Sequence, residues 1–469
     1  MRLKRDWESY PATYRAGEMQ TIANWIQAGE SGSLVGLPGA GKSNLLGFLS
    51  HRPEALRQYL PPDFPKLALI HVDLNNLPTI DLSTFFRVIL RAMNEARAQL
   101  ADLYASVASE VGLLYRKVED KTDPFLAQSA LRDALLLFRE QAIRVVLVLD
   151  PFDQFCKAAS TQVLDNLRGL RDGFKSTLSY LFGLRQEIAY LRSPEELGEL
   201  YEIIDTHVCW VGAMDRDDAR WVISQVEAST RRTFEQVHVD QIMALAGGFP
   251  ALLRVTSLWL FRQKTIPMMD TWLERLLATK SIVNRLFDLR QGLTGEEELA
   301  LSELQKVIAL SSPKMRRESL RQIGEKYQPT LTRLEDKTLC RRTETGLELF
   351  SPIFAGYVAQ MKGVSRGKIR YESATDHFFR GETDLTELSE KDRRLLRHFL
   401  DNPYAVQSLD DLIEAAWPED YSSGVSNEAV QQAIRHLRQQ IEPNPAKPCY
   451  LMTERGAGYR FFPEGAPRG

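Results

Sequence analysis

The N-terminal part of the chain alternates between short apolar runs and longer stretches whose hydrophobic residues follow helical spacing. The apolar runs are strand-length and lie at residues 33–35, 66–73, 145–150, 177–184 and 206–211. The stretches 82–100 and 125–139 between them show the spacing of amphipathic helices. A continuous apolar run such as 145–149 suits a strand that is buried on both faces. Strands that alternate with helices predict an α/β domain with a parallel sheet.

Beyond residue 213 the pattern changes to helices, followed by a first predicted hairpin. Helical patterns at 299–310 and 318–327 and the segment 331–340 precede this hairpin at 340–350. Three helices followed by a hairpin predict a winged-helix module. Residues 362–385 are polar, carry charges of both signs and contain three glycines. Such a composition predicts a linker between domains.

Three more amphipathic helices and a second hairpin are predicted in the C-terminal part. The second helix is expected at 409–417, and Ser426 can cap a third helix over 427–441. The apolar residues of the first and third helices are Leu388, Leu395, Leu396 and Phe399, and Val430, Ile434, Leu437 and Ile441. The segment 450–461 predicts the hairpin. This order of elements predicts a second winged-helix module.

Composition restricts the classes of protein to which the chain can belong. The 469 residues exceed one ordinary domain, and 44% of them are hydrophobic and 26% charged, as in globular proteins. Lys and Arg total 59 against 62 Asp and Glu, so any contact with nucleic acid must be local. Neither a signal peptide nor a membrane-length apolar run is evident. The four cysteines are isolated, which argues against a zinc site and favours a cytoplasmic protein.

The strongest motif is a phosphate-binding loop. Residues 36–43 fit the pattern G-x-x-x-x-G-K-S/T at every fixed position, between a short strand and an apolar helix. Glycines let backbone N–H groups turn toward phosphates, and the helix N-terminus adds positive potential. Lys42 is expected to reach the β- and γ-phosphates, and Ser43 to hold Mg²⁺. The predicted nucleotide-binding residues of the loop are Gly36, Gly39, Gly41, Lys42, Ser43 and Asn44.

A second acidic position supports this nucleotide site. Asp150 ends the apolar run at 145–149 and is expected to complete the Mg²⁺ shell. The next residue is Pro151, where many P-loop ATPases carry a glutamate. Asp153 is the nearest acid that could orient water, so slow hydrolysis or a nucleotide switch is expected. Arg185 follows the strand at 177–184 and is expected to sense the γ-phosphate.

These motifs together resemble the STAND-type P-loop NTPases of the AAA+ superclass. The turn at 248–250 is similar to a GxP element of that family, and 14–18 to its N-terminal Arg-x-x-Glu element. The segment 150–154 resembles its hhhhDxhDE element, with Gln154 where glutamate is usual. The departure at Gln154 again favours slow turnover.

The resemblance implies a cofactor and a domain order. The family binds ATP or ADP with Mg²⁺, and a helical lid follows its sheet. Pro250 of the lid and Arg15 are then expected near the adenine. A winged-helix module commonly follows the lid and packs on the ATPase, where it relays the nucleotide state.

The second hairpin carries a second resemblance. Its residues fit the pattern Thr453-x-Arg455-Gly456-x-Gly458-Tyr459-Arg460-Phe461. The segment 385–463 is therefore similar to the OmpR-type winged-helix effector domains of bacterial response regulators, in which the third helix enters the major groove and the wing touches the minor groove or backbone. Arginine and glutamine read guanine and adenine, and wing arginines take phosphates. The residues then expected to face DNA are Gln431, Gln432, Arg435, His436, Arg438, Arg455 and Arg460.

Charge in the C-terminal part weakens the expectation of tight DNA binding. From Thr386 onward, 10 Lys and Arg stand against 13 Asp and Glu, a net charge of −3. Glu428 also stands where the OmpR-type family commonly has a basic residue. A role in protein contacts therefore stays open.

The sequence thus predicts a multidomain protein with four folded parts. They are an α/β P-loop NTPase domain at 1–213, a helical lid at 214–290, a packed winged-helix module at 291–361 and, after the linker at 362–385, an OmpR-type winged-helix domain at 386–469. The expected function is a signal-transduction ATPase that couples nucleotide state to double-stranded DNA binding and transcription. The alternative is a defence or mobile-element switch that assembles on a protein partner or on its own copies, with the C-terminal module as an adaptor. A processive motor is disfavoured by the missing glutamate.

Overall fold

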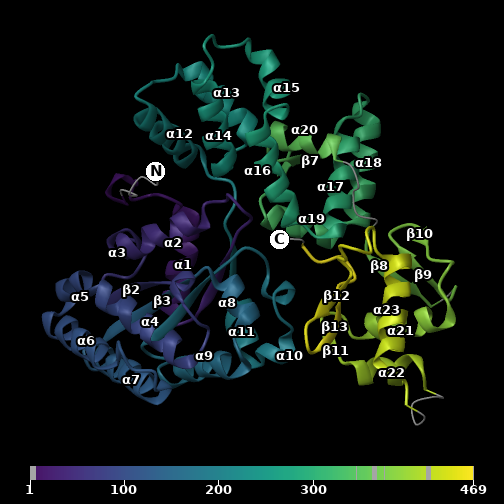
Figure 1. Ribbon diagram of the computed structural model, residues 1–469. Coiled ribbons are helices and arrows are strands. Elements are labelled where there is room, and N and C mark those ends of the chain that lie inside the picture. Colours follow the sequence, from purple (N-terminus) through teal and green to yellow (C-terminus); the bar gives the residue numbers. More distant parts are fainter. Residues whose placement is uncertain (1–6, 345, 362–366, 374, 419–423, 468–469) are drawn as a thin grey trace. The chain divides into compact units, whose positions relative to one another are not determined.

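The computed structural model describes residues 7–344, 346–361, 367–373, 375–418 and 424–467. These residues form two compact units (Figure 1). The first unit runs to Arg192 and includes Glu196–Asp218, and the second contains Ser193–Glu195 and the chain from Ala219 onward. The predicted multidomain organisation is confirmed at this level.

A five-stranded parallel sheet forms the centre of the first unit, which confirms the α/β prediction. Its strands are β1 (Gly32–Val35), β2 (Lys66–Asp73), β3 (Ile143–Asp150), β4 (Leu178–Leu184) and β5 (Val208–Trp210), in the order β2-β3-β4-β1-β5. From β1 the chain passes to β2 at the far edge, returns through β3 and β4, and then crosses to β5 on the other side of β1. The direction of winding therefore reverses at β1, where open parallel sheets bind ligands at their carboxyl ends.

Helices surround this sheet in the first unit. They are α1 (Ala16–Ala28), α2 (Lys42–His51), α3 (Pro53–Arg57), α4 (Leu82–Glu95), α5 (Arg97–Leu103), α6 (Ala105–Val118), α7 (Pro124–Glu140), α8 (Phe152–Ala158), α9 (Thr161–Gly173) and α11 (Glu199–Asp205), while α10 (Pro194–Leu197) contains residues of both units. Asp81 caps α4 by accepting the N–H of Thr84 at 2.9 Å, and Asp123 caps α7, which begins at Pro124. The helix predicted at 82–100 divides at Ala96, because polar residues interrupt its apolar stripe there.

The second unit begins with a bundle of helices. Its first helix, α12 (Arg216–Thr230), starts in the first unit and continues into the second. The others are α13 (Gln236–Ala246), α14 (Pro250–Phe261), α15 (Trp272–Leu277), α16 (Lys280–Gln291), α17 (Gly295–Ile308), α18 (Pro313–Lys326), α19 (Gln328–Asp336) and α20 (Pro352–Gln360), with a hairpin of β6 (Cys340–Thr343) and β7 (Gly346–Leu349). The helices and hairpin expected at 291–361 are therefore present. Ser351, which caps α20, donates to the carbonyl of Leu245 in α13 at 2.6 Å. Helix α20 also contacts α17, so it connects the helices around α13 with those around α17.

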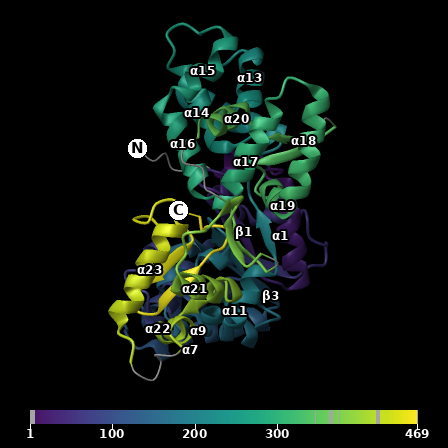
Figure 2. The same ribbon diagram turned by 90° about the vertical axis from the view of Figure 1, so that its right-hand side faces the viewer.

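Among the described residues from 367 onward, the second unit holds two three-stranded sheets and three helices. These elements are β8 (Ile369–Glu372), β9 (His377–Arg380), β10 (Thr383–Asp384), α21 (Glu390–Asp401), β11 (Val406–Gln407), α22 (Leu409–Ala416), α23 (Asn427–Ile441), β12 (Leu451–Glu454) and β13 (Gly458–Phe461). The helices α21, α22 and α23 lie together in Figure 1 and Figure 2, and their apolar faces share one core. Leu395, Leu412 and Ile434 are buried in it.

The linker predicted at 362–385 is wrong for most of its length. Residues 362–366 lie outside the described part, but the antiparallel strands β8, β9 and β10 occupy 369–384. Ile369 and Phe378 are buried in the same core as α23. Strand alternation places apolar residues on one face only, so the charges between them gave this segment the average composition of a linker.

The C-terminal module is also joined to the preceding helices within the second unit. The N–H groups of Gly295 and Glu296, at the start of α17, donate to the carbonyls of Gly465 and Glu464 at 3.2 and 3.0 Å. The N–H of Ile369 donates to Pro463 at 2.7 Å. Residues 463–465 therefore attach the module to the preceding helices by hydrogen bonds, which corrects the expectation that a linker separates the two. None of the described helices is both long and apolar enough to span a bilayer.

Candidate nucleotide site and DNA-binding surface

The phosphate-binding loop connects the carboxyl end of β1 to α2, at the point where the sheet reverses direction. Gly39 and Gly41 have φ of 89° and 92°, a region that favours glycine. A Cβ on Gly36 would lie 2.9 Å from the carbonyl oxygen of Val211, so this position also excludes larger residues. The loop therefore presents its backbone at the N-terminus of α2, as binding of phosphate requires. Asn44, predicted to bind nucleotide, lies in the first turn of α2.

Lys42, at the end of this loop, forms a buried ion pair with Asp150, at the end of β3. The Lys42 Nζ atom lies 2.5 Å from Oδ1 of Asp150, and the residues are 6% and 5% exposed. A Cβ on Gly183 of β4 would lie 2.2 Å from the same oxygen, so glycine makes room for the carboxylate. The predicted phosphate-binding lysine and metal-binding aspartate are therefore brought together.

Other oxygen donors lie near this pair. Ser43 is exposed in the first turn of α2, one residue beyond Lys42. Asp73 ends β2 and is aligned with Asp150 on the neighbouring strand. Carboxylate and hydroxyl oxygens are the ligands that Mg²⁺ prefers, so these residues fit the predicted metal. Sequence reasoning missed Asp73, although its place at the end of an apolar run repeats the pattern of Asp150.

His71 is a second residue that sequence reasoning missed. It lies two residues before Asp73 on β2, so the two side chains share one face of the strand. Burial lowers the pKa of His71, while the charges of Asp150 and Asp73 oppose that shift. Burial therefore favours the neutral imidazole.

Asp153, in the first turn of α8, is bonded to the backbone at the end of β4. Its Oδ1 atom accepts the backbone N–H of Arg185 at 2.8 Å, which fixes the end of β4 against the first turn of α8. The side chain is 6% exposed, and burial raises the pKa of its carboxyl group. Asp153 thus has a structural partner in place of open solvent. The side chain of Arg185 is exposed at the carboxyl end of β4.

Arg15 contacts backbone carbonyls around the loop, where a contact with adenine was expected. Its NH2 group donates to the carbonyls of Ala40 at 2.7 Å and Gly212 at 2.8 Å. The backbone N–H of Arg15 donates to Asp218 at 2.8 Å, in the first turn of α12. Arg15 is 2% exposed and has φ of 56°. We call Arg15, Ala40, Gly212 and Asp218 the Arg15 network, and it joins the phosphate-binding loop to the start of α12.

The pKa of Asp218 is unusual within this network. Burial raises it from 3.8 to about 6, and the hydrogen bond from Arg15 offsets part of this rise. No sequence signal distinguished Asp218 from its neighbours Asp215 and Asp217. Its role depends on contact with a residue 203 positions earlier in the chain.

The turn that contains Pro250 lies in the second unit. Gly247 and Gly248 have φ of 62° and 79°, Phe249 caps α14, and Pro250 is its first residue. Proline at this position needs no hydrogen bond from its nitrogen. A Cβ on Gly247 would lie 1.9 Å from the carbonyl oxygen of Phe350, so the turn packs closely against the segment before α20.

The outward face of α23 is open. Gln431, Gln432 and Arg435 are exposed, as predicted, and the helix buries Val430, Ile434, Leu437 and Ile441 on its opposite side. Gln439 is exposed one turn beyond Arg435 and extends the same face, although sequence reasoning missed it. Arg455 is exposed in the turn between β12 and β13.

The other three residues expected to face DNA are held by partners within the module. Arg438 donates to the carbonyl of Leu451 at 2.9 and 2.6 Å and to the hydroxyl of Thr453 at 2.8 Å, and burial lowers its pKa. Arg460 is 4% exposed, and its NH2 group lies 2.7 Å from Glu454. The half-exposed His436 contacts Asp392, with 2.8 Å between Nδ1 and Oδ2. These side chains were expected to face DNA, but their tertiary partners were not visible in the sequence.

Comparisons with known proteins match the C-terminal part of the chain by sequence and a larger part by structure. Residues 382–461 match the family described as "Transcriptional regulatory protein, C terminal". The alkaline phosphatase synthesis transcriptional regulatory protein SphR of Synechococcus elongatus is 44% identical over 80 residues. These residues are 17% of this chain and 30% of SphR. The transcriptional regulatory protein YvrH of Bacillus subtilis is 43% identical over 70 residues, which are 15% of this chain and 29% of YvrH. The chain thus spans about three tenths of the length of these relatives.

Solved structures share little sequence with the chain. A Walker-type ATPase of Pyrococcus abyssi aligns with 75% of this chain and 99% of its own, at 14% identity and a TM-score of 0.42. The ORC2 protein of Aeropyrum pernix in its ADP form aligns with 74% and 95%, at 14% identity and 0.39. The DNA-binding domain of RstA from Klebsiella pneumoniae, in complex with its DNA box, aligns with 21% and 96%, at 23% identity and 0.18. The chain therefore combines a parallel-sheet α/β unit that carries a P-loop with a C-terminal winged-helix domain of the transcriptional-regulator type.

Proposed function

We propose that this chain is a nucleotide-dependent switch of the STAND type that controls DNA binding by its C-terminal winged-helix domain. The Lys42–Asp150 pair at the reversal point of the sheet carries this proposal, because it occurs in the same chain as a transcriptional-regulator domain. ATP or ADP with Mg²⁺ is the expected ligand, and transcription is the expected process.

The residues of the site divide the work of holding this ligand. Lys42 and the loop glycines bind the phosphates, while Ser43 and Asp150 hold Mg²⁺, with Asp73 beside them. Mg²⁺ held by these residues would supply positive charge that stabilises the negative charge developing on the phosphate oxygens. Lys42 then exchanges its carboxylate partner for phosphate oxygens. Asp153 is engaged by Arg185, and Pro151 and Gln154 offer no strong base, so hydrolysis is slow.

The Arg15 network supports a link between nucleotide state and the rest of the chain. A shift of the loop at Ala40 moves the acceptor of the Arg15 guanidinium, and Arg15 also holds Asp218 at the start of α12. This helix continues into the second unit, which carries the winged-helix domain. Nucleotide and DNA then affect one another if they favour the same arrangement of the chain.

A second candidate function is a switch whose C-terminal module contacts protein. The engagement of Arg438 and Arg460 within the module favours it, because the open face keeps only Arg435 and Arg455 as cations among the seven predicted residues. Glu428 on the same helix adds a negative charge.

A salt titration with duplex DNA separates the two functions. If the chain binds DNA, the logarithm of its binding constant falls linearly with the logarithm of the salt concentration, because phosphate contacts release counterions. Binding of the full chain should be measured with ATP, with ADP and without nucleotide. Absence of DNA binding at low salt in all three conditions would exclude the DNA-binding function and favour the adaptor.

A further inference from the structure

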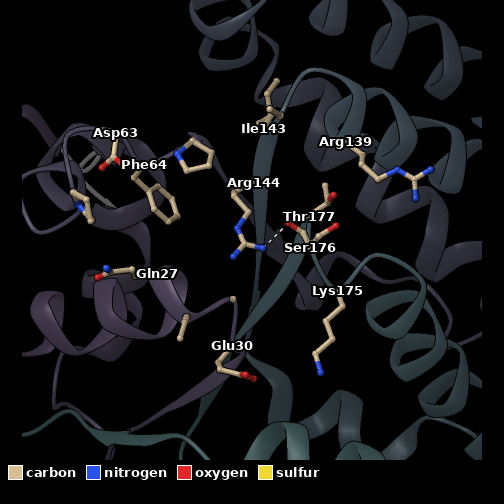
Figure 3. A pocket seen from close by; sticks show the side chains of 15 residues that line it. Gln27, Glu30, Asp63, Phe64, Arg139, Ile143, Arg144, Lys175, Ser176 and Thr177 are labelled. Carbon is tan, nitrogen blue, oxygen red and sulfur yellow. Dashed lines mark hydrogen bonds between the residues drawn. The ribbon is translucent and has the colours of Figure 1, made fainter.

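A large hollow lies at the amino-terminal end of the first unit's sheet, the end opposite the phosphate-binding loop. Its volume is about 840 Å³. Figure 3 shows the side chains that line it. The first residues of β3 and the residues that directly precede β2 and β4 line it, together with the C-terminal end of α1. The hollow is therefore built entirely from the first unit.

Internal hydrogen bonds fix the wall that precedes β2. The guanidinium of Arg57 donates to the carbonyls of Pro62 at 3.1 Å, Phe64 at 2.7 Å and Pro65 at 3.1 Å. This arginine lies behind the wall and contributes no charge to the lining. The Phe64 ring and its neighbouring prolines thus form an apolar side that exists without a ligand.

Glycine makes room for the central cation of the hollow. Gly29 ends α1 with φ of 75°, and a Cβ there would lie 2.8 Å from NH2 of Arg144. The NH1 group of Arg144 donates to the carbonyl of Ser176 at 2.5 Å, which orients the guanidinium. Figure 3 shows Arg144 between Phe64 on one side and Ser176 and Lys175 on the other.

The charges that line the hollow do not balance. Its cations are Arg139, Arg144 and Lys175, and within the described part of the chain none of them has a carboxylate at ion-pair distance. Of its two acids, Glu30 is paired with Arg171, which lies outside the lining, at 3.1 Å, and Asp63 is exposed. Burial lowers the pKa of Arg144, as expected for a half-buried guanidinium without a counter-charge.

We propose that this hollow binds a small organic anion, whose carboxylate or phosphate group is held by Arg144, Lys175 and Arg139 and whose apolar part packs on Phe64. Guanidinium groups suit such oxyanions because their N–H groups match both oxygens of the anion. Most small-molecule sites similarly combine an apolar lining with a few polar groups that fix orientation.

The hollow is separate from the nucleotide site. Arg144 and Asp150 lie on the same strand, and six residue steps of about 3.3 Å place them about 20 Å apart. The inference therefore does not rest on the proposed nucleotide function, and its failure leaves that function untouched.

Calorimetry on the full chain tests the inference, with citrate as the carboxylate probe and inorganic phosphate as the phosphate probe. The test variant is Arg139→Gln with Lys175→Gln, because both side chains are exposed and their replacement leaves the fold intact. The matched control is Arg116→Gln with Lys117→Gln, which removes two charges from the exposed surface of α6 in the same unit. A Lys42→Ala variant separates this site from phosphate binding at the loop.

The test variant lacks two of the three cations. Loss of even one charge-assisted contact should weaken binding of the probe about tenfold or more. The control should bind both probes as the unmodified chain does. Lys42→Ala should keep its citrate affinity and lose only the phosphate that binds at the loop, so its remaining phosphate binding reports on the hollow. Binding of citrate alone or phosphate alone would identify the group that the hollow accepts. Failure of both probes at millimolar concentration would overturn the inference. So would equal weakening in the control, or a loss of binding confined to Lys42→Ala.

Discussion

The phosphate-binding loop and the outward face of α23 were both predicted from spacing. The predicted residues come together at the loop, whereas on α23 only some of them face outward. At the loop, Lys42 pairs with Asp150 of β3, which lies 108 residues later in the chain. On α23, Arg435 and Arg438 are only three residues apart, yet one is open and the other is bonded to β12. Backbone conformation sets the loop, because the φ values of Gly39 and Gly41 lie in a region that few other residues adopt. A long arginine on a helix can instead turn toward protein or solvent, so spacing alone does not decide its role.

The largest expected effect lies at the loop. Lys42→Ala removes charge-assisted hydrogen bonds to phosphate and should weaken ATP affinity about a hundredfold. Calorimetry with ATP and Mg²⁺ measures this change. The control is Lys117→Ala, which removes an exposed lysine from the same unit. Unchanged ATP affinity in Lys42→Ala would contradict the site.

The next effect tests the open side of α23. Arg435→Ala should weaken duplex DNA binding about tenfold, the value of one good contact to a base. Arg455→Ala should lower the salt slope by about 0.9 if it contacts one phosphate. Arg394→Ala is the control, because it removes a partly exposed arginine, paired with Glu390, from α21 of the same module. Equal losses for all three variants would indicate a general charge effect and no specific face.

Arg438→Ala tests whether the arginine that is bonded to β12 contributes to stability, in contrast to the open Arg435. The Arg438 side chain joins α23 to β12, so its loss should lower the unfolding free energy of the module by about 1–3 kcal/mol. Arg435→Ala should change it by less than about 0.5 kcal/mol, as expected for an open surface residue. Chemical denaturation followed by circular dichroism compares the two. Equal stability of the two variants would contradict the assignment of Arg438 to the fold.

The smallest effect concerns pH at the Arg15 network. An acid whose pKa is higher in the folded chain binds protons more strongly there, so stability falls as pH rises between 3.8 and about 6. Asp218→Asn removes this contribution, and its thermal midpoint should fall less over that window than that of the unmodified chain. Thermal unfolding at several pH values measures the difference, with Asp217→Asn as the control at an exposed neighbour. Identical pH profiles for the unmodified chain and Asp218→Asn would contradict the raised pKa.

Sequence patterns predicted the local structure better than they predicted side-chain partners. The parallel strands and the burial of α23 followed from hydrophobic periodicity, which reflects the core directly. Residues 369–384 were not predicted as strands, because charged residues stand between their few apolar residues and hide the strand pattern. The roles of Arg15 and Asp218 depend on a hydrogen bond across 203 residues, for which no local pattern exists.

The central claim is that nucleotide at the loop alters DNA binding by the C-terminal domain. The most direct measurement is the DNA affinity of the full chain with ATP and Mg²⁺ and without nucleotide, for the unmodified chain and for Lys42→Ala. The account predicts that nucleotide changes the affinity of the unmodified chain, that DNA changes ATP affinity by the same factor, and that Lys42→Ala loses both effects. DNA affinity that is the same with and without nucleotide in the unmodified chain would contradict it.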